Sequence, residues 1–383
     1  MVPRFTAHRP KGRGMLAVCC LALLGSLGLS AGAAAAPTRT SRPLPVSAST
    51  GVTFQGISQA ECAANRRAGR IIFVTSYSYA PAASIADVVV AARRGFFKDM
   101  CLDVALQPGF STDNVALVSA GRVQITSLGS DSEVLAARAE GANLEGILTY
   151  GHTAISELIT PGDVKITSLK QLDGKTVGIK GALPYEVSAM LAKLGVDIAS
   201  LNQVQVGYNP VIIDQGRIMA LPVYKSNEIR ELNVLGDKYT AWDPTRYDVA
   251  ASFAALVVNT NFARAHPTAV ADFLRADIAG FWWAYRHQDQ AVAYCENLVP
   301  PQLGITRPVG RFRWRVESSL VIHSTPASEP IGGLDLSLIK AEYAQDVHLH
   351  LVAPGVDIST AFDTAFLTEI YRGVTLVWPK KFT

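Results

Sequence analysis

Residues 86–109 read ADVVVAARRGFFKDMCLDVALQPG and join a helix to a strand. The first part is helical in pattern, and Gly95 closes it, because glycine takes the left-handed backbone of a helix C-terminus at little cost. The stretch LDVALQPG at 102–109 is typical of a strand that ends in a Pro-Gly turn. The strand-like IIFVTSY at 71–77 precedes the helix. Together these segments predict a βαβ unit.

The same alternation continues along the chain. Further strands are expected at 122–129, 144–151, 175–181, 202–209 and 216–224, with helices at 112–122, 130–141, 184–195, 225–232 and 266–287 and a return strand at 253–260. Strands separated by helices of this length predict right-handed βαβ units and a parallel-dominated sheet. The second series begins after a turn at Pro161–Gly162. The expected fold class is α/β with two lobes, residues 70–152 plus 254–383 and residues 153–253.

The first 36 residues resemble a secretory signal peptide. A basic start without acids leads into an apolar stretch that ends in small residues with alanines in A-x-A spacing. A retained signal anchor is the alternative. Residues 37–69 are expected to form a flexible leader, and the chain is predicted to be exported to the periplasm or cell surface.

Charge and composition exclude some partners. The whole chain has a net charge of +3, and the four basic residues of the signal leave about −1 (3 − 4) for the mature protein. That balance gives no reason to expect a nucleic-acid or anionic-membrane partner. A monomer is expected.

Three cysteines remain after the signal peptide: Cys62, Cys101 and Cys295. In an oxidising compartment they allow one disulfide and one spare thiol. A Cys62–Cys101 pair is favoured because each of the two cysteines lies just before an expected strand, although the other pairings stay open. Their spacing does not suit a metal site.

Enzyme signatures are mostly missing. After the expected signal peptide, the sequence contains no G-x-S-x-G, HExxH or G-x-G-x-x-G motif and no complete G-x-x-x-x-G-K-[ST] phosphate loop. No metal, cofactor or catalytic residue is therefore expected. An exported enzyme that uses Glu228 as an acid or base is the competing interpretation.

Tyrosines gather where expected strands stop. In open α/β sheets, ligands bind outside the carboxyl ends of the strands, so aromatic residues there favour a flat, partly apolar ligand. A general enrichment of tyrosine in strands is the simpler explanation. The residues concerned are Tyr77, Tyr79, Tyr150, Tyr185, Tyr208 and Tyr224.

Two helix starts supply polar groups beside these tyrosines. Ser130 opens a Ser-x-x-Glu capping box directly after a strand, and Asn227 and Glu228 follow the strand that ends at Tyr224. Free N–H groups at such helix starts bind polar ligands. Glu228 would accept a hydrogen bond from an amide, amine or ring N–H. Plain helix capping, without any ligand, explains the same residues.

Several stretches in order resemble solute-binding proteins of ABC importers, in the nitrate/sulfonate/taurine-like group with the type II periplasmic-binding fold. They are the opening segment 86–109, residues 117–147, SLKQLDGKTVGIKG at 168–181, and PVYKSNEIRELNVLG at 222–236 with the residues up to 284. The last is most similar to the branch that binds thiamine-pyrimidine precursors and riboflavin. That branch also contains a pyrimidine synthase with a cysteine-rich motif, which this chain lacks.

The resemblance implies a two-lobed fold with a ligand cleft and a function in binding rather than turnover. It places ligand contacts at Tyr77, Ser78, Tyr79, Ser130, Tyr185, Tyr224, Asn227 and Glu228. The expected partners are a small, planar heteroaromatic ligand and an ABC permease with its ATPase, and cleft closure would signal capture. The alternatives are an enzyme of the pyrimidine-synthase-like branch, a binder of nitrate- or sulfonate-type anions, and a sensor module.

Overall fold

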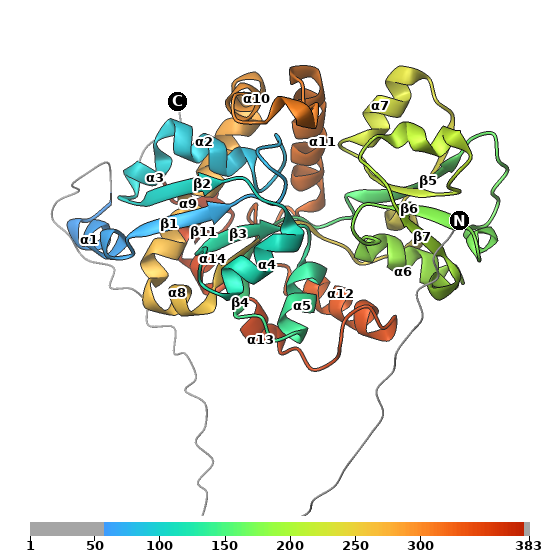
Figure 1. Cartoon of the computed structure of the whole chain (residues 1–383). Coiled ribbons are helices and arrows are strands. Elements are labelled where there is room, and N and C mark those ends of the chain that lie inside the picture. The colour runs from blue at the N-terminus through green and yellow to red at the C-terminus, as the bar shows by residue number, and fades with distance from the viewer. Residues whose placement is uncertain (1–56, 379–383) are drawn as a thin grey trace, which may run out of the picture. The chain divides into compact units, whose positions relative to one another are not determined.

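A five-stranded mixed sheet in the order β2-β1-β3-β10-β4 organises the larger part of the protein (Figure 1). The computed structural model describes residues 57–378, so the expected signal peptide and residues 37–56 of the leader lie outside the described range. The strands are β1 (Arg70–Val74), β2 (Asp103–Gln107), β3 (Ile125–Leu128), β4 (Leu144–Gly151) and β10 (Phe253–Asn259).

Four of these strands run in one direction and the return strand runs against them. β1 pairs in parallel with β2 and β3, whereas β10 lies antiparallel between β3 and β4. The βαβ units therefore form as the alternating pattern predicts. The carboxyl ends of β1, β2 and β3 meet at one edge, where the loops after them reach a common cavity.

The helix after β1 packs closely on the long helix that follows β10. α2 (Ala86–Arg94) ends at Gly95, whose φ of 80° is the left-handed conformation expected there. α9 (Pro267–Arg286) approaches α2 at Gly280, where an added Cβ would lie 2.2 Å from the carbonyl oxygen of Asp87. Phe73 and Phe273 stack with centroids 5.7 Å apart in the same core. Only glycine permits this spacing between the helices.

The remaining helices cover the sheet and extend the chain to its described end. They are α1 (Gln59–Arg67), α3 (Phe96–Asp99), α4 (Ser111–Ser119), α5 (Asp131–Ala139), α8 (Thr260–Ala265), α10 (Gln288–Glu296), α11 (Arg307–Ser324), α12 (Leu336–His348), α13 (Ile358–Ala361) and α14 (Ala365–Ile370), with a hairpin of β11 (Tyr371–Arg372) and β12 (Thr375–Leu376). No helix within residues 57–378 is both long and apolar enough to cross a membrane.

Residues 156–242 form smaller sheets of their own. The order β8-β5-β9 is antiparallel, while β6 and β7 pair in parallel. The expectation of a parallel-dominated sheet is therefore wrong for residues 156–242. β5 and β9, which the sequence did not predict, form the antiparallel pairs. The elements are β5 (Ser156–Pro161), β6 (Thr176–Ile179), α6 (Tyr185–Lys193), β7 (Asn202–Gln205), β8 (Leu221–Tyr224), α7 (Glu228–Leu235) and β9 (Tyr239–Trp242).

Sheet membership divides the chain near residues 152 and 253. We call the elements of the five-stranded sheet and its helices lobe 1, and residues 156–242 lobe 2. In Figure 1, α11 lies beside α10 on the side of lobe 1 that is next to the green and yellow elements of lobe 2. Hydrogen bonds from α11 to the turn before α7 confirm that the two elements are neighbours.

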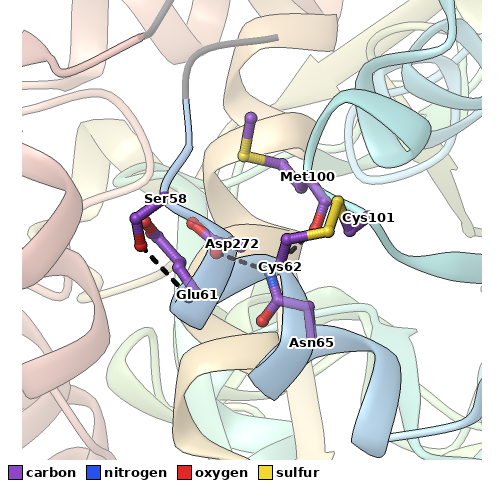
Figure 2. Close-up of a disulfide and its surroundings, with 7 residues drawn as sticks. All are labelled: Ser58, Glu61, Cys62, Asn65, Met100, Cys101 and Asp272. Atoms are coloured by element: carbon purple, nitrogen blue, oxygen red, sulfur yellow. Dashed lines mark hydrogen bonds between the residues drawn. A yellow bond between two sulfur atoms is a disulfide. The ribbon is translucent and has the colours of Figure 1, made fainter. Parts of the chain in front are cut away.

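The last part of the expected leader belongs to the fold. Residues 59–67 form α1, whose first turn is capped by Ser58 as its hydroxyl accepts from the N–H of Glu61 at 3.1 Å. Figure 2 shows the Cys62–Cys101 disulfide that attaches this helix to the end of α3, which confirms the favoured pairing. Asn65 adds a buried hydrogen bond of 2.8 Å to the carbonyl oxygen of Met100. These ties order a segment that its composition alone did not predict to be helical.

Candidate ligand-binding cavity

A cavity of about 970 Å³ lies between the strand ends of lobe 1 and the elements of lobe 2. Its walls come from the loops after β1 and β2, the first turns of α4, α5 and α6, the ends of β6 and β8, and α11. Seven of the ten predicted ligand contacts line it. They are Tyr77, Ser130, Tyr185, Tyr208, Tyr224, Asn227 and Glu228.

The other three predicted residues do not line the cavity. Tyr150 is fully buried, donates its hydroxyl to Asp277 at 2.8 Å and stacks on Phe281. Tyr79 donates to the carbonyl oxygen of Leu106 at 3.1 Å, and Ser78, in the same loop after β1, is buried. Tyr150 does not reach the cavity because β4 is buried along its whole length. The end of a strand in the sequence is therefore not always an open edge of the sheet.

Three aromatic rings from both lobes meet at one end of the cavity. Tyr77 contacts Phe110 edge-on at 5.5 Å and Tyr208 at a tilt of 58°, also at 5.5 Å. Phe110 and Tyr208 keep 42% and 53% of their surface exposed. A planar ligand sandwiched between Tyr77 and Tyr208 needs about 7 Å between the ring centres. The two rings therefore have to separate before a ligand can stack between them.

Glu228 is held by the protein itself. One carboxylate oxygen accepts from the Nζ of Lys180, and the other accepts from the backbone N–H of Tyr224 at 2.9 Å. The carboxylate is 3% exposed and the Lys180 side chain 13%. Both oxygens thus have protein donors, and Lys180 is the more accessible member of the pair. Glu228, which the sequence predicts to contact the ligand, is thus one member of an ion pair in the cavity wall.

The turn before α7 is docked on α11. Arg313 donates to the side-chain oxygen of Asn227, and its guanidinium lies 5.5 Å from the ring centre of Tyr77. Glu317 accepts from the Ser226 hydroxyl at 2.6 Å and from the backbone N–H of Ala83 at 2.8 Å. One carboxylate therefore bridges the loop after β1 and the turn of lobe 2.

Two further carboxyls face the cavity from opposite lobes. Glu133, in the first turn of α5, accepts from the N–H of Gly129 at 2.9 Å, and Glu186, in the first turn of α6, accepts from the N–H of Ser156 at 3.2 Å. Burial raises the pKa of Glu133 to about 7, and the nearby Glu186 charge adds to this rise. Burial also raises the pKa of Glu186.

Sequence reasoning missed Lys180, Phe110 and the two α11 residues. Lys180 follows β6 as the tyrosines follow their strands, so the same strand-end rule applied to polar residues would have found it. Arg313 and Glu317 had no such signal, since they lie 86 and 91 residues from their partners in the sequence. Within the described range, no three His, Cys, Asp or Glu side chains are grouped so as to hold a metal ion.

Several solved structures with similar folds are named as binding proteins. The alkanesulfonate-binding protein SsuA from Xanthomonas axonopodis pv. citri superposes with a TM-score of 0.54 at 15% identity, over 77% of this chain and 98% of that one. A Candida albicans protein described as having the generic periplasmic binding protein fold gives 0.54 at 16% identity, over 80% and 97% of the two chains. These likenesses show the two-lobed α/β periplasmic-binding fold.

The sequence comparisons are more specific. The riboflavin-binding protein RibY of Chloroflexus aurantiacus is 25% identical over 243 residues, which cover 59% of this chain. The chain spans 66% of the length of that relative. The family model described as NMT1/THI5 like matches residues 82–291, more than half of the sequence. The chain therefore belongs to the NMT1/THI5-like family.

Proposed function

We propose that this protein is an exported solute-binding protein that captures a neutral or cationic planar heteroaromatic ligand in the cavity and delivers it to an ABC permease. The observation that carries the proposal is the excess of acidic over basic side chains in an aromatic cavity. Two cations, Lys180 and Arg313, line it. Six acids line it as well, namely Asp113, Glu133, Glu140, Glu186, Glu228 and Glu317.

Both cations already bond to protein groups, although the buried Nε of Arg313 has no hydrogen-bond partner within the described residues. Lys180 is paired with Glu228, and Arg313 is bonded to Asn227 with Glu317 one helical turn away. A sulfonate or nitrate would enter a cavity lined by six acids and two cations, and like charges at close range cost several kcal/mol in protein sites of this kind. A ring bearing N–H or amine donors matches the acceptors on Glu133 and Glu186.

The aromatic end of the cavity supports a flat ligand. Tyr77, Phe110 and Tyr208 offer ring faces and edges from both lobes. Inserting a ring between Tyr77 and Tyr208 adds contacts with each lobe at once. A ligand that gains contacts in both lobes shifts the equilibrium toward the closed form, which is the form expected to dock on a permease.

A ligand screen on purified protein tests the proposal. We would unfold and refold the protein to remove carried-over ligand, then titrate it with riboflavin, an aminopyrimidine, an alkanesulfonate and nitrate by calorimetry. Saturable one-to-one binding of a heteroaromatic compound, recovered unchanged, is the expected result. Binding of the sulfonate alone would refute the ligand class, and conversion of a bound compound to product would refute a pure binding function.

A further inference from the structure

The contact between α11 and the turn before α7 lies at the base of the cavity, beside the point where the chain passes from lobe 1 to lobe 2. Ser156 at the start of β5 pairs with Tyr224 at the end of β8. The next residue, Lys225, donates its backbone N–H to the carbonyl oxygen of Ile155 at 3.0 Å. The turn is thus attached to the crossing segment on one side and to α11 on the other.

Ser226 is the inner member of this contact. Its side chain is fully buried and does not line the cavity, and its hydroxyl donates to Glu317 at 2.6 Å. Glu317 is also buried, and its second oxygen holds the N–H of Ala83 in the loop that carries Tyr77. A single carboxylate therefore fixes the distance between the two segments that supply aromatic and polar groups to opposite walls.

Arg313 completes the contact one helical turn earlier. It faces Glu317 on the same side of α11, bonds to Asn227 of the turn, and lies over the Tyr77 ring of the loop. Arg313 and Glu317 thus each contact both the lobe 2 turn and the lobe 1 loop. Residues four apart lie on one helix face, so α11 presents both groups together.

We infer that Glu317, with Arg313, is a positioning residue that holds the 224–228 turn in register with the 77–85 loop, so that Ser226 controls ligand affinity without touching the ligand. The inference rests on the proposed binding function. Without the Glu317–Ser226 bond, the turn samples several positions, and the ligand has to order it on binding. The expected effect of Ser226→Ala is about a tenfold weaker affinity, the scale of one buried hydrogen bond to a charged group.

The test compares Ser226→Ala with Ser318→Ala, a buried serine of α11 whose hydroxyl donates to the carbonyl oxygen of Arg315 in the same helix at 3.5 Å. Riboflavin, followed by its fluorescence, is the probe for affinity. Glu317→Gln should weaken binding less than Glu317→Ala, because an amide can still accept from Ala83 and donate to Ser226. Glu317→Ala should weaken binding at least as much as Ser226→Ala, and the double variant should add little.

A second readout needs no ligand. Spin labels at Arg93→Cys on α2 and Val234→Cys on α7, both exposed positions, report the distance between the lobes; the native Cys295 is buried and the other two described cysteines form the disulfide. Ser226→Ala should broaden this distance distribution, and Ser318→Ala should not. If neither the unmodified protein nor Ser226→Ala binds riboflavin but Ser226→Ala broadens the distance distribution, the positioning inference holds and the proposed ligand fails. An unchanged distribution and affinity in Ser226→Ala, even with a lower Tm, would overturn the inference.

Discussion

The buried ion pair between Lys180 and Glu228 makes a sharp prediction about stability. Lys180→Met leaves the Glu228 carboxylate 3% exposed, with only the Tyr224 N–H as a donor. Breaking a buried pair by removing one partner typically costs about 3–5 kcal/mol. We expect the lower end, about 3 kcal/mol, because the Tyr224 bond remains.

The reverse substitution should cost less. Glu228→Gln keeps an oxygen for the N–H of Tyr224, and Lys180, at 13% exposure, can turn its ammonium toward water in the cavity. The expected loss is about 1 kcal/mol, the net value of an ordinary hydrogen bond. Lys180→Met combined with Glu228→Gln should be close to the single Glu228→Gln variant, because the uncompensated carboxylate is gone.

Urea unfolding at pH 7 measures these differences, with unchanged m-values as the check that the unfolding reaction stays the same. The order of losses should persist in 1 M salt because buried pairs are weakly screened. If Lys180→Met cost no more than Glu228→Gln, the pair would not be a buried ion pair in solution. Riboflavin titration tests whether Glu228 also contacts the ligand. If it does, Glu228→Gln should lower the affinity more than Lys180→Met.

Three further predictions follow from other parts of the fold. Replacing Cys62 and Cys101 by serine should lower the free energy of unfolding by about 4 kcal/mol on the chain-entropy model, since the disulfide closes a 39-residue separation, and a loss under about 1 kcal/mol in urea unfolding would contradict this. Tyr208→Ala should weaken riboflavin binding about tenfold with little change in Tm, since the ring is half exposed, whereas Tyr208→Phe should retain affinity. Glu133 binds its proton more tightly when folded, with a pKa of about 7 against 4.5, so its contribution to stability is lost as pH rises from about 4.5 to 7, and Glu133→Gln should flatten that part of the stability–pH curve.

Most helices and strands of lobe 1 could be predicted from signals within a few residues of the sequence. Gly95 marked the end of α2, and the Ser130 capping box marked the start of α5, because both depend on backbone chemistry within a few residues. β5 was missed for an equally local reason. Its sequence SELITP ends in Pro161, which reads as a turn, yet Pro161 sits at the last position of the strand, where the sheet tolerates it.

Burial explains which tyrosines were correctly placed at the cavity. Tyr224 is the last residue of β8 and Tyr208 follows β7, both short strands of lobe 2 that end near the cavity, whereas Tyr150 lies one residue before the end of the eight-residue β4. Sequence shows where a strand stops, but the covering of its end depends on α9 and its neighbours, more than 100 residues later. The strand-end rule therefore identifies candidates, and only the packing of distant helices decides among them.

The turn YKSNE shows why the chemistry of a site is harder to predict than its place. The sequence put Asn227 and Glu228 at a helix start beside the cavity, where the structure has them. Their partners come from elsewhere: Lys180 from the end of β6 and Arg313 from α11. From the sequence alone, Glu228 is a candidate hydrogen-bond acceptor for a ligand. In the structure its carboxylate is paired with Lys180 in the cavity wall. Free acceptors in this cavity are consequently to be sought at Glu133 and Glu186. Each accepts from a backbone N–H on one oxygen, and neither forms an ion pair with a cation within residues 57–378.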